Sequence, residues 1–187
     1  MGNEQQRQCV IPIHKPSQRE LIFFFATGIL VSIPFATFYE SLYPAAFSSA
    51  LLVAVLAPFI EELAKVFPLF YRHGETERSL VTLGLLLGLG FGIVEFVEYI
   101  VIGHAPIVAS IPHIIFHASS ATITAYGIAK KNPVPYFLLA VGLHVVNNFF
   151  ALASDVLSLF ATLLVLIAVY ALAWKFYHQA SKEKIVV

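Results

Sequence analysis

The sequence predicts an all-α, polytopic integral membrane protein, a bundle of about six transmembrane helices with both termini in the cytoplasm. The chain of 187 residues is 59% hydrophobic and only 12% charged, whereas a soluble domain carries about 25% charged residues. Its apolar stretches are long enough to cross a bilayer as helices, which takes about 20 residues. None of them shows the alternating polarity of membrane barrel strands, so helices are the structure that pairs the backbone in lipid.

The apolar stretches divide the chain into a membrane domain and two polar ends. We expect a cytoplasmic arm at 1–19, a transmembrane domain at 20–177 and a cytoplasmic tail at 178–187. The arm is long and polar and no small-residue cleavage site follows the first stretch, so that stretch is expected to be a retained helix and not a signal peptide. The expected spans are 20–39, 45–70, 80–103, 106–130, 134–154 and 155–177.

The basic residues indicate the orientation of the spans. The connections at 40–44, 103–106 and 154–155 contain no Lys or Arg. Because cytoplasmic loops carry the excess of Lys and Arg, the two termini are expected to be cytoplasmic, which requires an even number of spans. The basic residues other than Lys65 lie before the first span, between the second and third, at or after the end of the fourth, and at or after the end of the last. They are Arg7, Lys15, Arg19, Arg72, Arg78, Lys130, Lys131, Lys175, Lys182 and Lys184.

Charge and cysteine content exclude several classes of partner. The formal net charge is zero, so there is no basic field to hold a nucleic acid. The single cysteine, Cys9, cannot form an intrachain disulfide or a zinc site of several cysteines. The lipid bilayer is therefore the partner that composition indicates.

Polar side chains inside the spans are the main functional signal. An ionisable group deep in lipid costs at least about 2.5 to 3.5 kcal/mol, so each must face the bundle interior, have a partner or perform a function. The first and last stretches hold almost none and are expected to form a lipid-facing cover, although Asp155 can cap the last helix. The four middle stretches carry Glu61, Glu62, Lys65, Glu95, Glu98, His113, His117, His144, Asn147 and Asn148.

Spacing and depth predict that these groups gather. Lys65 follows Glu61 by four residues, His117 follows His113 by four, and Asn148 follows His144 by four, so each pair shares a helix face. Counting the helical rise of about 1.5 Å per residue from the span ends places Glu61, His117 and His144 near mid-bilayer, with Glu95 nearer the non-cytoplasmic side. The sequence thus predicts one polar pocket inside the membrane.

The residue types in this pocket suit hydrolysis. A glutamate beside Lys65 can stay ionised and take a proton from water, while a His N–H or the Asn148 amide can stabilise negative charge on a carbonyl oxygen. The remaining imidazole and Glu95 can orient the water, protonate a leaving amine or bind a metal ion. His117 and His144 with Glu95 can form a zinc site with water as fourth ligand, and the residues leave open whether a metal is used.

The motifs resemble those of the PrsW intramembrane proteases. Residues 61–65 are similar to their EExxK motif, residues 91–95 to their FAxxE motif, and the later histidines fall in similar places. Residues 144–148 are similar to the HxxxN motif of the related CAAX-processing and bacteriocin-processing proteases. The resemblance covers roughly residues 60–148. In the second motif Gly92 replaces Ala, and Phe96 stands where Asn is usual.

This resemblance implies an intramembrane peptidase that hydrolyses a peptide bond in a membrane-embedded or membrane-adjacent substrate. It implies Glu61 as the base that activates water, with Glu62 and Lys65 as its supports. His144 is implied as a water or metal contact and Asn148 as the oxyanion donor. Either His113 or His117 can be the third-motif histidine; His117 is preferred because a run of small residues follows it.

Other interpretations fit the same residues. The carboxylates and imidazoles also suit a proton or divalent-cation transporter or channel, and the fold also suits a non-enzymatic membrane scaffold or immunity protein. HExxH, a serine elbow and paired intramembrane Asp residues are absent, which disfavours those classes of protease. Pro58 and Pro68 predict local irregularity around the Glu pair. Close helix packing is predicted at Gly84, Gly88, Gly90 and Gly92.

Overall fold

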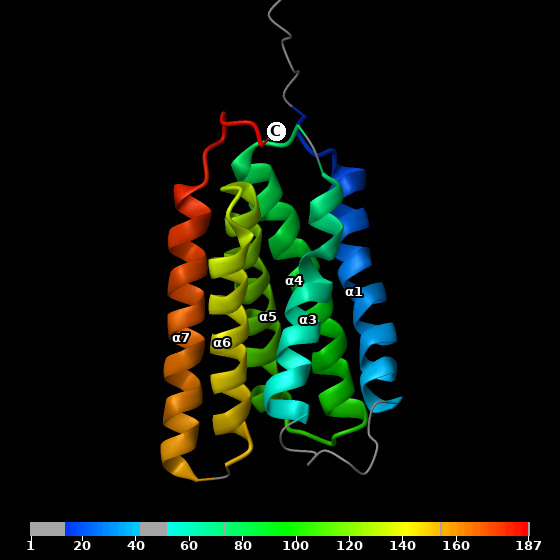
Figure 1. Ribbon diagram of the computed structural model, residues 1–187. Helices are drawn as coiled ribbons and strands as arrows, with labels where there is room; N and C mark the ends of the chain where they lie inside the picture. The colour runs from blue at the N-terminus through cyan, green and yellow to red at the C-terminus, as the bar shows by residue number, and fades with distance from the viewer. Residues whose placement is uncertain (1–13, 42–51, 73, 154, 187) are drawn as a thin grey trace, which may run out of the picture.

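The computed structural model describes residues 14–41, 52–72, 74–153 and 155–186, and in this part of the chain it is helical with no strand (Figure 1). The all-helical prediction is confirmed. Most of the expected arm and the start of the second expected span, Ala45, lie outside the described residues. The elements are α1 Gln18–Ser41, η1 Leu52–Leu56, α3 Ala57–Val66, η2 Phe67–Tyr71, α4 Glu77–Val101, α5 Ile107–Ala129, α6 Pro133–Ala151 and α7 Val156–Gln179.

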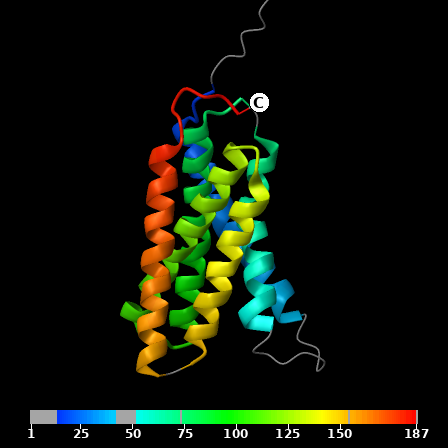
Figure 2. The ribbon, with the colours of Figure 1, turned by 60° about the vertical axis from the view of Figure 1, so that its left-hand side comes forward.

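Four of the described helices, α4, α5, α6 and α7, are long and apolar enough to cross a membrane. They run side by side along a common axis, as two views 60° apart show (Figures 1 and 2). α1 packs against α4 and α3, whereas α7 packs mainly against α5 and α6, so α1 and α7 lie at opposite edges of the bundle. Both edge helices carry exposed large apolar side chains, among them Phe23 (64% exposed) and Leu164 (67% exposed). These positions agree with the expected cover.

The second expected span is interrupted at its prolines. Residues Leu52–Leu56 are π-helical, Ala57–Val66 form a ten-residue α-helix, and Phe67–Tyr71 form a 3-10 helix. Pro58 and Pro68 both stand in the first turn of their helices, where a missing N–H costs no hydrogen bond. The predicted irregularity is confirmed. α3 is a short α-helix that carries Glu61 and Glu62, with a π-helix before it and a 3-10 helix after it.

Glycines bring α4 against its neighbours. A Cβ on Gly88 would collide with the backbone carbonyl of His117 on α5, and one on Gly90 would collide with the carbonyl of Phe25 on α1. No residue with a side chain allows this approach, so the predicted close packing is confirmed. α4 is therefore the central helix, held between α1 and α5.

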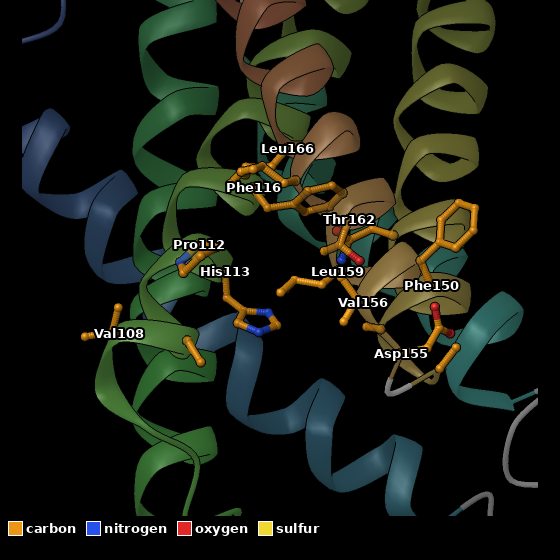
Figure 3. A pocket seen from close by; sticks show the side chains of 15 residues that line it. Val108, Pro112, His113, Phe116, Phe150, Asp155, Val156, Leu159, Thr162 and Leu166 are labelled. Atoms are coloured by element: carbon orange, nitrogen blue, oxygen red, sulfur yellow. The ribbon is translucent and has the colours of Figure 1, made fainter.

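A cavity of about 560 Å³ lies between α5, α6 and α7 (Figure 3). Its walls come from the first half of α5, the end of α6 and the first half of α7. Near it, Asp155 caps α7 by accepting hydrogen bonds from the Ser158 hydroxyl (2.8 Å) and backbone N–H (3.0 Å), as expected. These bonds lower the pKa of Asp155 below its ordinary value.

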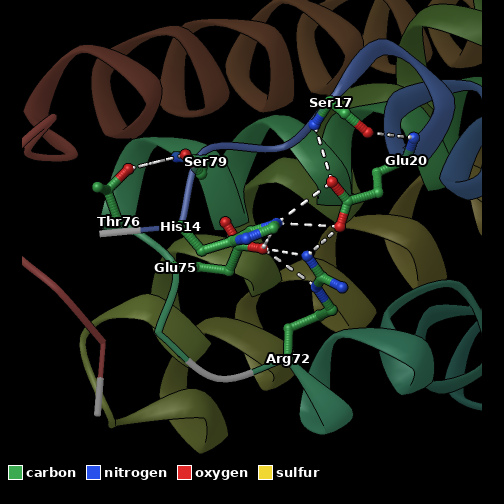
Figure 4. A network of polar contacts seen from close by, with 7 residues as sticks. All are labelled: His14, Ser17, Glu20, Arg72, Glu75, Thr76 and Ser79. Atoms are coloured by element: carbon green, nitrogen blue, oxygen red, sulfur yellow. Dashed lines mark hydrogen bonds and ion pairs between the residues drawn. The ribbon is translucent and has the colours of Figure 1, made fainter. Parts of the chain in front are cut away.

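The opposite end of the bundle is tied together by ion pairs (Figure 4). Arg72 donates to Glu20 of α1 (2.8 Å) and also contacts Glu75, and His14 lies 3.0 Å from Glu20. The backbone of His14 bridges to Glu75, and that of Thr76 bridges to Ile185 near the C-terminus. Segments far apart in the sequence thus meet at one end.

Glu77, the first residue of α4, holds the C-terminal tail at this end. It has no exposed side-chain surface, and its carboxylate accepts from Lys130 Nζ (2.6 Å) and the Ser181 N–H (2.9 Å). Lys184 Nζ lies 3.3 Å away. The hydrogen bond with Glu77 raises the pKa of Lys130. Described basic residues that were expected on one side of the membrane therefore cluster at one end of the molecule.

Candidate functional site

The two glutamates of α3 have different surroundings. Glu62 and Lys65 are fully buried, and Lys65 Nζ donates to Glu62 Oε1 over 2.7 Å. Lys65 also lies over the ring of Phe91 on α4, 4.7 Å from its centroid. Glu61 keeps 20% of its side-chain surface exposed and lies 4.0 Å from Lys65. Lys65 is thus primarily the partner of Glu62, and Glu61 is the more accessible carboxylate.

Glu62 fixes the orientation of His144. Its Oε1 atom accepts from Ser120 Oγ (2.9 Å) and from His144 Nδ1–H (2.9 Å) in addition to Lys65. With the proton on Nδ1, His144 presents the lone pair of Nε2, which lies 3.8 Å from Glu61 Oε2. A carboxylate that holds one ring nitrogen while the other faces a site is the arrangement found behind metal-binding histidines.

Glu95 of α4 plays the equivalent part for the second histidine. Its Oε2 atom contacts His117 Nε2, and His117 is only 1% exposed. When Nε2–H donates to Glu95, Nδ1 of His117 carries the lone pair, and this atom is buried with no hydrogen-bond partner among the described residues. Glu95 also lies 3.7 Å from Nδ1 of His113, whose ring stacks on Tyr99.

These side chains converge on one small space. One oxygen of Glu61 and one ring nitrogen each of His117 and His144 lie within 4.8 Å of one another. Within the described part of the chain, Glu61 Oε2 and His117 Nδ1 are buried without a hydrogen-bond partner. Each such atom costs about 1 to 3 kcal/mol. A water molecule or a cation shared by the three residues would satisfy both atoms.

The donor set also fits a metal ion. Two histidines and a carboxylate with an open fourth position are the ligands of catalytic zinc sites. A second group of the same composition, Glu95 with His113 and His117, has ligand atoms within the same 4.8 Å limit. The set expected from sequence, His117 with His144 and Glu95, is therefore divided between two groups that share His117. In the first of them Glu61 would be the carboxylate ligand, while Glu95 contacts the other ring nitrogen of His117.

The amides of α6 lie at the margin of this site. Asn148 is half-buried. Asn147 is buried, donates from Nδ2 to Asn148 Oδ1 over 3.5 Å, and lines the cavity between α5, α6 and α7. Asn147 thus faces the cavity, while Asn148 lies one turn beyond His144.

Sequence reasoning missed two residues that complete the site. Ser120 is fully buried and donates to Glu62, and its signal was its position three residues after His117 on the same helix face. Phe116 packs its ring against both histidine rings, with centroids 4.9 Å from His144 and 5.7 Å from His117. An aromatic residue in an apolar helix carries no signal of such a role.

No family model matches the chain, and no curated protein or solved structure is significantly similar to it.

Proposed function

We propose that this protein is an intramembrane peptidase, similar in its motifs to the PrsW family, that hydrolyses a peptide bond with a water molecule activated by Glu61. The observation that carries the proposal is the convergence of Glu61, His117 and His144 within 4.8 Å, inside a bundle of apolar helices. A partly exposed carboxylate with two oriented imidazoles can position and deprotonate a single water. Glu61 Oε2 and His117 Nδ1 have no hydrogen-bond partner among the described residues, so a water molecule between them has two groups to bind.

The proposed reaction uses each side chain in a defined way. Glu61 takes a proton from water, and the oxygen attacks the carbonyl carbon of the peptide bond. The C–N bond then breaks as the amine receives that proton from Glu61. The Asn148 amide is the candidate donor to the oxyanion, because each histidine uses its N–H on a carboxylate and presents a lone pair to the site. Glu62 and Glu95 act through the histidines, because each holds one ring nitrogen in place.

A divalent ion such as zinc would be held by Glu61, His117 and His144. It would act as a Lewis acid and lower the pKa of the bound water toward 7. The chain's own residues orient the water and move its proton in either case. Metal analysis of the purified protein, with His144→Ala as the variant that loses a ligand, decides between a metal-assisted and a purely glutamate-based reaction.

The proposed topology has six spans and cytoplasmic termini. Supporting it are the 24-residue α1, the interrupted stretch that contains α3, and the four apolar helices α4 to α7. The described basic residues outside the helices gather at one end of the bundle, together with residues 14–17 and 180–186. The positive-inside rule makes that end cytoplasmic.

The test of the function compares cleavage products in cells that express variants. Glu61→Gln and His144→Ala should each abolish the new peptide termini that wild-type protein produces in the membrane proteome. Glu183→Gln is the matched control, because Glu183 is exposed in the C-terminal tail. Identical termini in wild type and both site variants would end the proposal.

Cation transport is the second candidate, and one observation favours it. The group of Glu61, His117 and His144 and the group of Glu95, His113 and His117 share His117. Carboxylates and imidazoles therefore form a continuous series, as they do along an ion path. Proton or zinc flux into liposomes that is lost in Glu61→Gln and Glu95→Gln, without peptide cleavage, would support transport. Cellular activity that persists in Glu61→Gln without flux would indicate a scaffold.

A further inference from the structure

The cavity between α5, α6 and α7 lies directly beside the candidate site. Phe116 forms part of its wall and also contacts the rings of His144 and His117. Asn147, which lines the cavity, stands three residues after His144 and thus on the same face of α6. Its volume of about 560 Å³ lies within the range of ligand pockets, about 300 to 1,000 Å³. Only the ring of Phe116 would separate an occupant of the cavity from the rings of His117 and His144.

The rim of the cavity is exposed and, apart from Asp155, largely apolar. Val108 of α5 is 80% exposed, and Val156 and Leu159 of α7 are 71% and 70% exposed. Side chains of this kind on a membrane helix face lipid, so the cavity opens sideways toward the bilayer. Its occupant is therefore expected to arrive through the membrane and to be largely apolar.

The interior of the cavity is not purely apolar. His113 projects into it among Pro112, Phe116 and Leu159 (Figure 3), and Asn147 lines it from α6. An imidazole and an amide each offer hydrogen-bond donors and acceptors. A lipid acyl chain has no groups to use them. An unwound polypeptide segment does, because its backbone N–H and C=O groups have lost their helical partners and need others within the bilayer.

We propose that this cavity binds an unwound, apolar segment of a membrane-embedded polypeptide, with His113 and Asn147 pairing its backbone. The proposal rests on the proposed function, for which it names the substrate class. A peptide bond can be attacked only where the helix around it is open, and the cavity supplies both the apolar walls and the polar groups that an open segment requires. The segment would lie next to Phe116, beside His117 and His144.

Photocrosslinking in liposomes tests this binding directly. The probe is an apolar Leu/Ala peptide of about 22 residues, long enough to span the bilayer, with a central Gly-Pro pair and one adjacent diazirine leucine. The full-length Glu61→Gln protein is used so that the peptide is not consumed, and wild type is run in parallel. A phospholipid with a diazirine in its acyl chain is the second probe. Crosslinks are mapped by mass spectrometry.

Peptide crosslinks are expected at residues 108–116 of α5 and 156–166 of α7. Leu159→Trp and Leu163→Trp, which fill the cavity from an exposed rim, should abolish them. Leu164→Trp should not, because Leu164 is similarly exposed (67%) but lies outside the cavity. The proposal is overturned when the tryptophan variants leave the crosslinks unchanged, or when the lipid probe labels the cavity equally with and without peptide.

The two proposals fail in different ways. Crosslinking in the cavity without cleavage by wild type would support the binding site and contradict the proposed peptidase activity. Cleavage of the peptide by wild type without crosslinks in the cavity would support the peptidase activity and contradict this binding site.

Discussion

Glu61 and Glu62 are neighbours in the sequence but differ in their surroundings. Glu62 is fully buried and accepts from Lys65, Ser120 and His144, whereas Glu61 is partly exposed and 3.8 Å from His144. The motif predicts both as one catalytic unit with Glu62 as a support of Glu61. In the structure Glu62 instead supports His144 and pairs Lys65, because the two carboxylates leave the helix about 100° apart.

Replacing each glutamate should therefore have a different effect on stability. Glu62→Gln leaves the buried Lys65 without its close partner and should lower the free energy of unfolding by about 3 to 5 kcal/mol. Glu61→Gln should lower it by less than about 1 kcal/mol, because Glu61 is only a distant partner of Lys65. Thermal and denaturant unfolding of the purified proteins in detergent measure both. A larger loss for Glu61→Gln than for Glu62→Gln would contradict the roles assigned here.

At this scale the sequence predicts which residues gather but not how they pair. Position along each helix placed Glu61, His117 and His144 at one depth, and the structure brings their polar atoms within 4.8 Å. The pairing of Glu95 with His117, and of Ser120 with Glu62, depends on how each helix is rotated about its axis. That rotation is set by packing between helices, which no local pattern contains.

Among the helices, α4 depends most on small residues. A Cβ on Gly88 would collide with the His117 carbonyl and would also meet Ala121 at 2.7 Å and Ala118 at 2.9 Å, all on α5. Any side chain here would push apart the helices that carry Glu95 and His117. The packing of α4 on α5 therefore also sets the geometry of the candidate site.

Gly88→Ala should lower the free energy of unfolding by about 1 to 3 kcal/mol, the usual cost of overpacking. Gly142→Ala is the matched control, because a Cβ on this α6 glycine meets no atom within 4 Å. That variant should be neutral or stabilise the protein by up to about 1 kcal/mol, since alanine favours a helix. Unfolding in detergent compares the two. Equal effects in both variants would show that α4 does not depend on this contact.

The helices themselves were largely predictable, and the second expected span shows the limit. Apolar runs of the right length predicted α4 to α7 to within a few residues. Pro58 and Pro68 predicted irregularity, but not that regular α-helix would be confined to Ala57–Val66.

The described basic residues outside the helices and their acidic partners gather at one end of the bundle. Residues 14–20, 72–78, 130 and 181–186 meet in the ion-pair network, whereas the connection at 103–106 has no basic residue. The charge pattern predicted that these segments share a side. It could not predict that Glu75 and Glu77 would be buried there. Glu75 contacts His14 and the C-terminal tail, and Glu77 contacts the tail and Lys130.

The six-span topology predicts which side of the membrane each connection reaches. A membrane-impermeant maleimide should label Cys9, the only cysteine, in inside-out vesicles and not in right-side-out ones. In a Cys9→Ser background, Lys182→Cys should behave in the same way, and Ala153→Cys should be labelled only from the opposite side. Both substituted positions are exposed. Labelling of Ala153→Cys from the side that labels Lys182→Cys would contradict the topology.

The central claim is that Glu61, His117 and His144 act together on one water molecule, and isotope transfer from that water tests it most directly. Purified protein is reconstituted in liposomes with membrane-derived polypeptides in ¹⁸O-labelled water, and new carboxyl termini are analysed by mass spectrometry. Wild type and Glu183→Gln should produce termini that carry one ¹⁸O atom, and Glu61→Gln and His144→Ala should produce none. The same labelled termini in Glu61→Gln as in wild type would contradict the account.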